Sequence, residues 1–83
     1  MKYIVLAGDP VGEIPVLFPS RVGHDYMAGR LAVAGLNVVA AGFLKLVDGG
    51  KVECSGRSES LRIPSRPKID ADLIAKSLVS LLD

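Results

Sequence analysis

The longest apolar run of the chain, residues 36–47, has hydrophobic side chains at nearly every position. A strand that is apolar on both pleat faces is buried on both sides, so this run predicts the central strand of a sheet. The sequence Asp48-Gly49-Gly50 follows and supplies the positive-φ residues that a tight hairpin turn requires. Residues 51–54 are then expected to return beside the central strand.

Two shorter apolar segments precede this run and predict a β-hairpin at the start of the chain. Residues 3–7 are rich in β-branched and aromatic side chains, which fit a pleated surface. The Gly-Asp-Pro-Val-Gly sequence at 8–12 predicts a loop, and residues 13–18 predict the second strand. Pro15 has no N–H to donate, so this strand is expected at an edge of the sheet or with that amide side facing outward.

The spacing of apolar residues between the hairpin and the central strand predicts a helix over 24–34. Met27, Leu31 and Ala34 are four and three residues apart and share one helical face. Asp25 lies in the first turn, where a negative charge suits the exposed amides, and Gly35 is suited to a left-handed helix end.

A second helix is predicted over 69–82. Asp70 is expected to cap it, and Ile69 is expected to pack on Ile74 as a hydrophobic staple. Helical periodicity predicts a buried stripe on this helix that faces the sheet. Its large members are Ile74, Leu78, Leu81 and Leu82, with Ala71 and Ala75 beside them.

Residues 61–63 alternate and predict a further short strand with Leu61 and Ile63 pointing inward. The element order is then ββαββ(β)α within a single domain, residues 1–83. This order indicates an α+β fold, in which an antiparallel sheet of four to five strands carries both helices on one face. Because the central strand is apolar on both sides, the other face of the sheet is expected to need a partner.

Composition strengthens the expectation of a partner. Of the 83 residues, 49% are apolar without glycine, whereas about 45–50% is usual when glycine is counted. A chain this short lies near the lower limit for folding alone, and small domains often gain stability by association. Two explanations follow: the sheet is unusually well covered, or a second chain covers part of the apolar surface. The second explanation leads us to expect a homo-oligomer, most simply a homodimer.

Charge and cysteine content narrow the function classes. The formal net charge of +1 gives no overall attraction to nucleic acid or to an anionic membrane. The single cysteine, Cys54, cannot form an internal disulfide, which favours a cytoplasmic location. Asp9-Pro10 interrupts the first apolar segment before it reaches the length of a signal-peptide core, and no run is long enough for a membrane helix.

Few residues are suited to catalysis. His24 is the only histidine, and it begins the first predicted helix beside Asp25. A Cys-His enzyme would need His24 to contact Cys54. The simpler interpretation of Cys54 is a small buried hydrophobic residue. No zinc or iron spacing is present, and the 8–12 loop lacks a phosphate-binding pattern. We expect no enzyme, no metal and no cofactor.

The segment 57–68 is locally basic and is the candidate binding surface. Its expected contact residues are Arg57, Ser58, Glu59, Arg62, Arg66 and Lys68. Such a surface suits an acidic protein patch or phosphate groups. Aromatic residues for base stacking are scarce, which makes nucleic acid the weaker of these two expectations. An ordinary solvated loop and edge strand would carry similar charge.

Several segments together carry a resemblance to a known group of proteins. They are Ile14-Pro15-Val16-Leu17-Phe18-Pro19, His24, Ala41-Gly42-Phe43, Ser55-Gly56-Arg57-Ser58-Glu59-Ser60-Leu61, Ser65-Arg66-Pro67 and Asp70-Ala71-Asp72-Leu73-Ile74. In these segments, which are distributed over most of the chain, the protein resembles a family of small uncharacterised proteins encoded by temperate phages and prophages. The resemblance implies a bacterial or phage source, a cytoplasmic site of action and the binding of a host or phage protein.

The first functional hypothesis is therefore a non-enzymatic protein-interaction module that self-associates, with the exposed sheet face or the basic 57–68 segment as its contact surface. The alternatives are a nucleic-acid-associated regulator that uses the 57–68 segment and a small enzyme that uses His24 with Cys54 or a serine.

Overall fold

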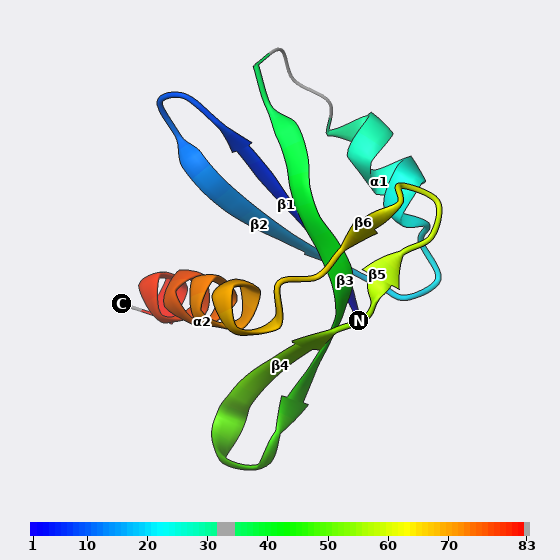
Figure 1. Ribbon diagram of the computed structural model, residues 1–83. Helices are drawn as coiled ribbons and strands as arrows, with labels where there is room; N and C mark the ends of the chain where they lie inside the picture. Colours follow the sequence, from blue (N-terminus) through cyan, green and yellow to red (C-terminus); the bar gives the residue numbers. More distant parts are fainter. Residues whose placement is uncertain (32–34, 83) are drawn as a thin grey trace.

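The protein is an α+β domain in which a four-stranded sheet is accompanied by two helices and a two-stranded sheet (Figure 1). The computed structural model describes residues 1–31 and 35–82. The elements are β1 (Lys2–Gly8), β2 (Gly12–Phe18), α1 (His24–Arg30), β3 (Asn37–Val47), a 3-10 turn (Asp48–Gly50), β4 (Lys51–Ser55), β5 (Arg57–Ser58), β6 (Ile63–Pro64) and α2 (Pro67–Leu82).

The large sheet has the strand order β2-β1-β3-β4, and every neighbouring pair is antiparallel. The N-terminal hairpin, the long third strand and its return are thus confirmed. Gly49 and Gly50 adopt positive φ values of 83° and 75° in the β3–β4 turn, as this turn chemistry predicts. β2 is an edge strand, which agrees with the position of Pro15 inside it.

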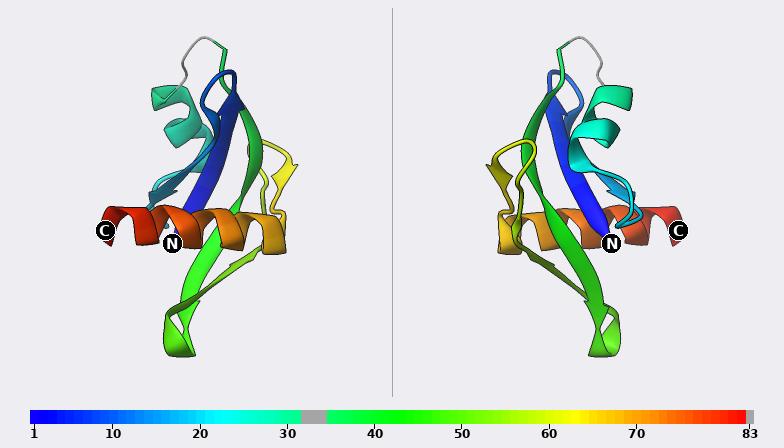
Figure 2. Two further views of the ribbon diagram at one scale, coloured as in Figure 1. Left: turned by 90° about the vertical axis from the view of Figure 1, so that its left-hand side faces the viewer. Right: turned by 90° about the vertical axis from the view of Figure 1, so that its right-hand side faces the viewer.

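The two helices lie on opposite faces of the sheet, which corrects the expectation that both pack on one face. Ile74 of α2 joins a buried cluster with Tyr3 and Val5. Met27 of α1 packs on the other face, against a cluster that contains Ile4 and Leu6. The two side views show α2 on one side of β1 and α1 on the other (Figure 2).

The reason is that the two inner strands, β1 and β3, carry apolar side chains on both faces of the sheet. Tyr3 and Val5 of β1 point to α2, whereas Ile4 and Leu6 point away from it. Each face therefore gains from being covered. The second face is covered by α1 and by Leu61 and Ile63 of the β5–β6 segment, so the predicted inward position of these two residues is confirmed. The last strand pairs with β5 in a separate small sheet instead of extending the large one.

The start of α2 differs from the predicted cap and staple. The helix begins at Pro67, whose missing N–H and fixed φ suit a first helical position. Asp70 lies inside the first turn, where its Oδ2 accepts a hydrogen bond from the Arg66 N–H at 2.7 Å. Ile69 is 57% exposed and Ile74 is buried, so the predicted staple is wrong.

Not every residue that was predicted to be helical lies within the described part of the chain. α1 ends at Arg30, and Gly35 has a positive φ of 87° beyond it. Residues 32–34, including Ala34, and the side chains of Leu81 and Leu82 lie outside the described part. Leu78 is half-buried against the cluster that contains Ile74, as the predicted buried stripe of this helix requires, whereas Ala75 is exposed.

Gly42 lies where two backbone segments approach each other. A Cβ added to it would lie 2.6 Å from the Ser55 carbonyl oxygen and 3.0 Å from the Ser65 Cβ. The bulge of β3 falls elsewhere, at Val39, because Leu6 pairs with Val38 and Val5 with Ala40.

Candidate functional site

The basic segment 57–68 does not form one continuous surface. Arg57 belongs to β5, and Arg62 lies exposed in the β5–β6 turn with a left-handed φ of 57°. Arg66 and Lys68 lie at the start of α2, which packs on the opposite face of the sheet. Ser58 is fully buried, and its hydroxyl accepts a hydrogen bond from the Leu61 N–H, so it supports the turn. The cations that a phosphate-binding surface would need are therefore divided between the two faces of the sheet.

Arg66 is the centre of an ion-pair network that connects α2 to the sheet. Its Nη1 and Nη2 donate to the two carboxylate oxygens of Glu13 at 3.0 and 2.9 Å. Its Nε donates to Asp70 Oδ1 at 2.9 Å, and the Tyr3 hydroxyl donates to Asp70 Oδ2 at 2.5 Å. Asp70 and Tyr3 are fully buried. Arg66 therefore joins β2 to α2, and its charge is already neutralised by two carboxylates.

The network changes the acidity of its members. The hydrogen bond from Arg66 holds the pKa of Glu13 below its usual range, and the same bond raises the pKa of Arg66. Burial, followed by the hydrogen bond to Asp70, raises the pKa of Tyr3. Sequence reasoning missed Tyr3 and Glu13, because an isolated tyrosine and glutamate in strands give no signal of a distant partner.

This shift in Tyr3 predicts a loss of stability at alkaline pH. The unfolded chain releases the tyrosine proton near pH 10.0, whereas the folded protein keeps it to higher pH. The contribution of Tyr3 to stability is thus fully present below that pH. Above it, we expect the free energy of unfolding to fall by up to about 1.4 kcal/mol per pH unit. Urea unfolding followed by circular dichroism up to about pH 11 measures this slope. Parallel pH curves for the wild type and Tyr3→Phe would refute the assignment to Tyr3.

His24 is held as a structural group by three neighbours. Its Nε2 donates to the Gly42 carbonyl oxygen at 2.8 Å, and its ring lies edge-on between Phe18 and Phe43 at centroid distances of 5.6 and 5.5 Å. Cys54 belongs to the cluster on the other face of the sheet, and burial raises the pKa of its thiol. The sheet thus separates His24 from Cys54, and the thiol is not activated as a nucleophile would be.

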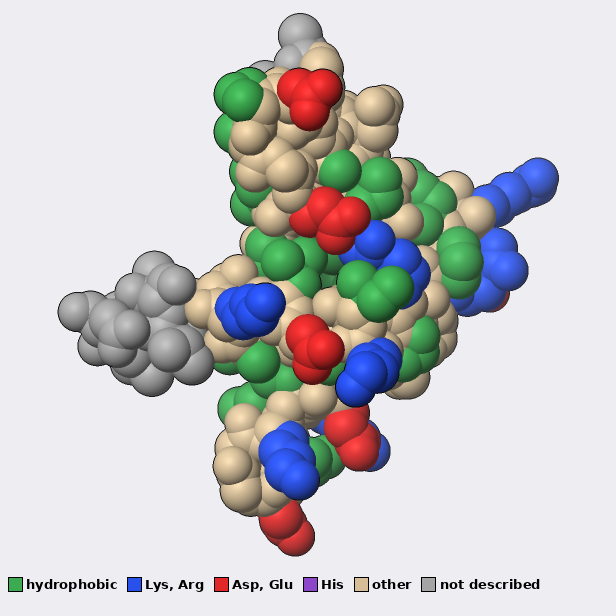
Figure 3. Space-filling model, turned by 60° about the vertical axis from the view of Figure 1, so that its left-hand side comes forward, with side chains coloured by type: hydrophobic (Ala, Val, Ile, Leu, Met, Phe, Trp, Pro, Cys, Tyr) green, Lys and Arg blue, Asp and Glu red, His purple; other side chains and the backbone are tan. Residues whose placement is uncertain are grey.

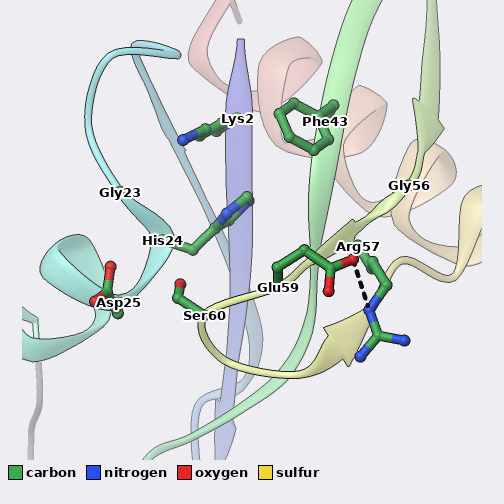
Figure 4. Close-up of a pocket in the computed structure, with 9 residues that line it drawn as sticks. All are labelled: Lys2, Gly23, His24, Asp25, Phe43, Gly56, Arg57, Glu59 and Ser60. Carbon is green, nitrogen blue, oxygen red and sulfur yellow. Dashed lines mark ion pairs between the residues drawn. The ribbon is translucent and has the colours of Figure 1, made fainter.

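One pocket does bring several predicted site residues together. It has a volume of about 570 Å³ and lies between the head of α1 and the β5–β6 turn (Figure 4). His24, Asp25, Arg57 and Glu59 line it, as do Lys2, Gly23, Phe43, Gly56 and Ser60. The predicted residues come from two segments that are distant in sequence, and the fold places them around one cavity. Lys2 and Phe43 are the additions that sequence reasoning missed.

A second candidate surface is the β3–β4 hairpin, which projects beyond the rest of the molecule (Figures 1 and 2). Leu46 and Val52 pair across this hairpin. Their side chains lie on the face of the sheet that α2 covers, but further from the core. Lys45 and Glu53 pair on the opposite face and form an ion pair of 3.7 Å. The hairpin is therefore amphipathic. The expected burial of β3 on both faces fails at Val39, Phe43 and Leu46, which are 38%, 41% and 67% exposed.

An apolar groove continues from this hairpin toward α2. Its volume is about 460 Å³, and it is lined by Met1, Leu17, Leu44, Lys45, Leu46 and Leu78. Met1 is 57% exposed. In the space-filling view, hydrophobic atoms lie between α2 and the projecting hairpin (Figure 3). The exposed Leu46 thus lines an apolar groove on the same surface.

Among the described residues, no cluster of three or more His, Cys, Asp and Glu side chains is arranged to bind a metal ion. Neither α1 nor the described part of α2 combines the length and apolar character needed to cross a bilayer. Comparisons of this chain with protein-family models, curated proteins and solved structures returned no match.

Proposed function

We propose that the protein is a non-enzymatic protein-interaction module that self-associates through the apolar face of the β3–β4 hairpin. The observation that carries the proposal is the exposure of Leu46 beside an apolar groove. Large apolar side chains that cluster on a surface mark interaction sites more often than single ones do. The cytoplasmic location and the phage or prophage source belong to the same proposal and rest on the sequence.

A second copy of the chain is the occupant that fits this surface. A twofold interface uses the same patch on both subunits, so the patch must be complementary to itself. This surface meets the condition, because Leu46 and the other residues that line the groove are mainly apolar and would face the same residues of the other copy. The net charge of +1 gives two copies little mutual repulsion.

We predict that Leu46→Lys weakens self-association. Lysine at the centre of the interface would bury an unpaired charge, and central contacts of this kind are worth about 2 kcal/mol or more. The dissociation constant of the wild-type dimer, measured by sedimentation velocity over a concentration series, is expected to rise about thirtyfold or more.

Val11→Lys is the matched control, because Val11 is also exposed, at 54%, and lies in the β1–β2 loop. It makes the same charge change away from the hairpin and should leave the dissociation constant unchanged. A wild-type protein that stays monomeric at the highest soluble concentration would contradict self-association. Equal weakening by both lysine variants would contradict the location.

A further inference from the structure

The outer edge of β4 presents main-chain groups that no neighbouring strand uses. Leu44 of β3 directs its main chain to β1, because its N–H donates to the Met1 carbonyl oxygen at 2.8 Å and its carbonyl oxygen accepts from the Met1 ammonium at 3.4 Å. Cys54 lies opposite Leu44, and Val52 lies two residues before Cys54. Residues of an antiparallel pair face each other and face away in alternation, so Cys54 and Val52 point their N–H and C=O groups away from β3. Within the described part of the chain, no loop, turn or helix main chain forms a hydrogen bond with these groups.

This edge is open along the part of β4 that lies near the turn. The β3–β4 hairpin projects beyond the other elements (Figures 1 and 2), and Val52 is half-buried between the exposed residues Lys51 and Glu53. Cys54 is only 7% exposed, so Val52 is the more accessible of the two outward-facing residues. A cavity of about 390 Å³ continues beside the edge and is bordered by Cys54 and by Pro67 at the start of α2. The space beside Val52 can therefore take another strand.

The opposite edge of the large sheet is protected from such pairing. β2 forms that edge, and Pro15 in the middle of β2 has no N–H to donate. Natural sheets use proline in this way to prevent further strands from adding. β4 contains no proline, so its outer edge keeps a complete set of donors and acceptors.

The charges of β4 make the strand complementary to itself. Lys51 and Glu53 are two residues apart and share one face of the sheet, opposite to the face of Val52 and Cys54. When two copies of β4 pair antiparallel about a twofold axis at Val52, Lys51 of each copy lies opposite Glu53 of the other. Opposite charges in such cross-strand positions attract each other.

The two other symmetric registers of this pairing lack the match. An axis at Glu53 places the two Glu53 carboxylates opposite each other, and like charges in that position repel. An axis at Cys54 places Lys51 opposite Arg57 of the other copy, which again brings like charges together. The charges therefore select the register in which Val52 lies opposite Val52. In that register, the outward N–H and C=O groups of the two Val52 residues bond to each other.

From these features we propose that the outer edge of β4 binds a second copy of the chain, whose β4 adds antiparallel in the register centred on Val52. The contact joins two β3–β4 hairpins into one four-stranded ribbon. It goes beyond the self-association proposed above, because it uses the main chain and the charged face of the hairpin, whereas Leu46 lies on the apolar face. A copy that uses both contacts meets two others, so assembly extends beyond a dimer.

The test uses two charge reversals that complement each other in this register. Lys51→Glu makes both of these charges negative, and Glu53→Lys makes both positive. Each variant alone would place like charges opposite each other, whereas an equimolar mixture restores two oppositely charged pairs. We expect the mixture to associate at least about tenfold more tightly than either variant alone, as measured by sedimentation velocity over a concentration series.

Arg30→Glu and Asp9→Lys are the matched control pair, because both residues are exposed and lie outside the hairpin. They change the net charge by the same amounts as the β4 pair, so their mixture reports the attraction that comes from net charge alone. Circular dichroism checks that each of the four variants is folded. The proposal fails if the mixture of β4 variants gains no more affinity than the control mixture does.

Amide hydrogen exchange of the wild-type protein gives a second measurement that needs no substitution. The Val52 N–H faces solvent in a single copy and bonds to the other copy in the ribbon, so its exchange should slow as the protein concentration is raised. Leu46→Lys should keep this slowing, which lets the two proposed contacts fail separately. An exchange rate that stays the same at every concentration would overturn the pairing. Protection of Val52 in a protein that sediments as a monomer would also overturn it, because the edge would then be covered within one chain.

Discussion

Replacing Asp70 with asparagine is expected to lower the free energy of unfolding by about 3 kcal/mol. Removing one partner of a buried ion pair usually costs about 3–5 kcal/mol. The lower end applies here because Arg66 is partly exposed and keeps its two hydrogen bonds to Glu13. The loss arises because the Tyr3 hydroxyl and the Arg66 Nε both donate to this carboxylate, and the asparagine amide can accept at one atom only.

Chemical denaturation in urea at neutral pH measures this loss, with Asp72→Asn as the control. Asp72 lies two residues further along the same helix and is exposed, so its substitution should change stability by less than about 0.5 kcal/mol. A double-mutant cycle with Tyr3→Phe should give a coupling energy of about 0.5–3 kcal/mol. Additive effects in that cycle, or similar losses for the two asparagine variants, would disprove the network as a stabilising unit.

The N-terminal hairpin and the β3–β4 hairpin could be predicted from sequence because their signals are local. Gly49 and Gly50 supply the turn that they were expected to supply, and the apolar runs on either side set the strands. The faces of the helices could not be predicted in the same way. Because β1 is apolar at Ile4 as well as at Tyr3, its pattern gives no preference for one face over the other.

The candidate sites show the same division between local and distant signals. His24 and Arg57 are noticeable in the sequence, but their meeting in one pocket depends on how α1 and the β5–β6 segment pack on the sheet. Arg66 was expected to bind a partner and instead binds Glu13, which is 53 residues away in the chain. Nothing at either position indicates the other, since ion pairs between distant segments depend on the completed fold.

Ile74→Ala is expected to lower the free energy of unfolding by about 2–5 kcal/mol, through lost burial and the cavity that remains. Ile74 is only 1% exposed and is the residue of α2 that enters the cluster formed by Tyr3, Val5, Ala40, Leu44 and Cys54. That cluster is the main apolar contact between α2 and the sheet, so the loss should fall near the middle of the range or above it. Urea denaturation again provides the measurement.

Ile69→Ala is the control for this substitution, because it makes the same change in the same helix at a residue that is 57% exposed. Alanine has the higher helix propensity, so the control should be neutral or should stabilise by a few tenths of a kcal/mol. The difference between the two variants therefore isolates burial from propensity. If Ile69→Ala were as damaging as Ile74→Ala, the helix would have to face the sheet differently, and the hydrophobic staple rejected above would be restored.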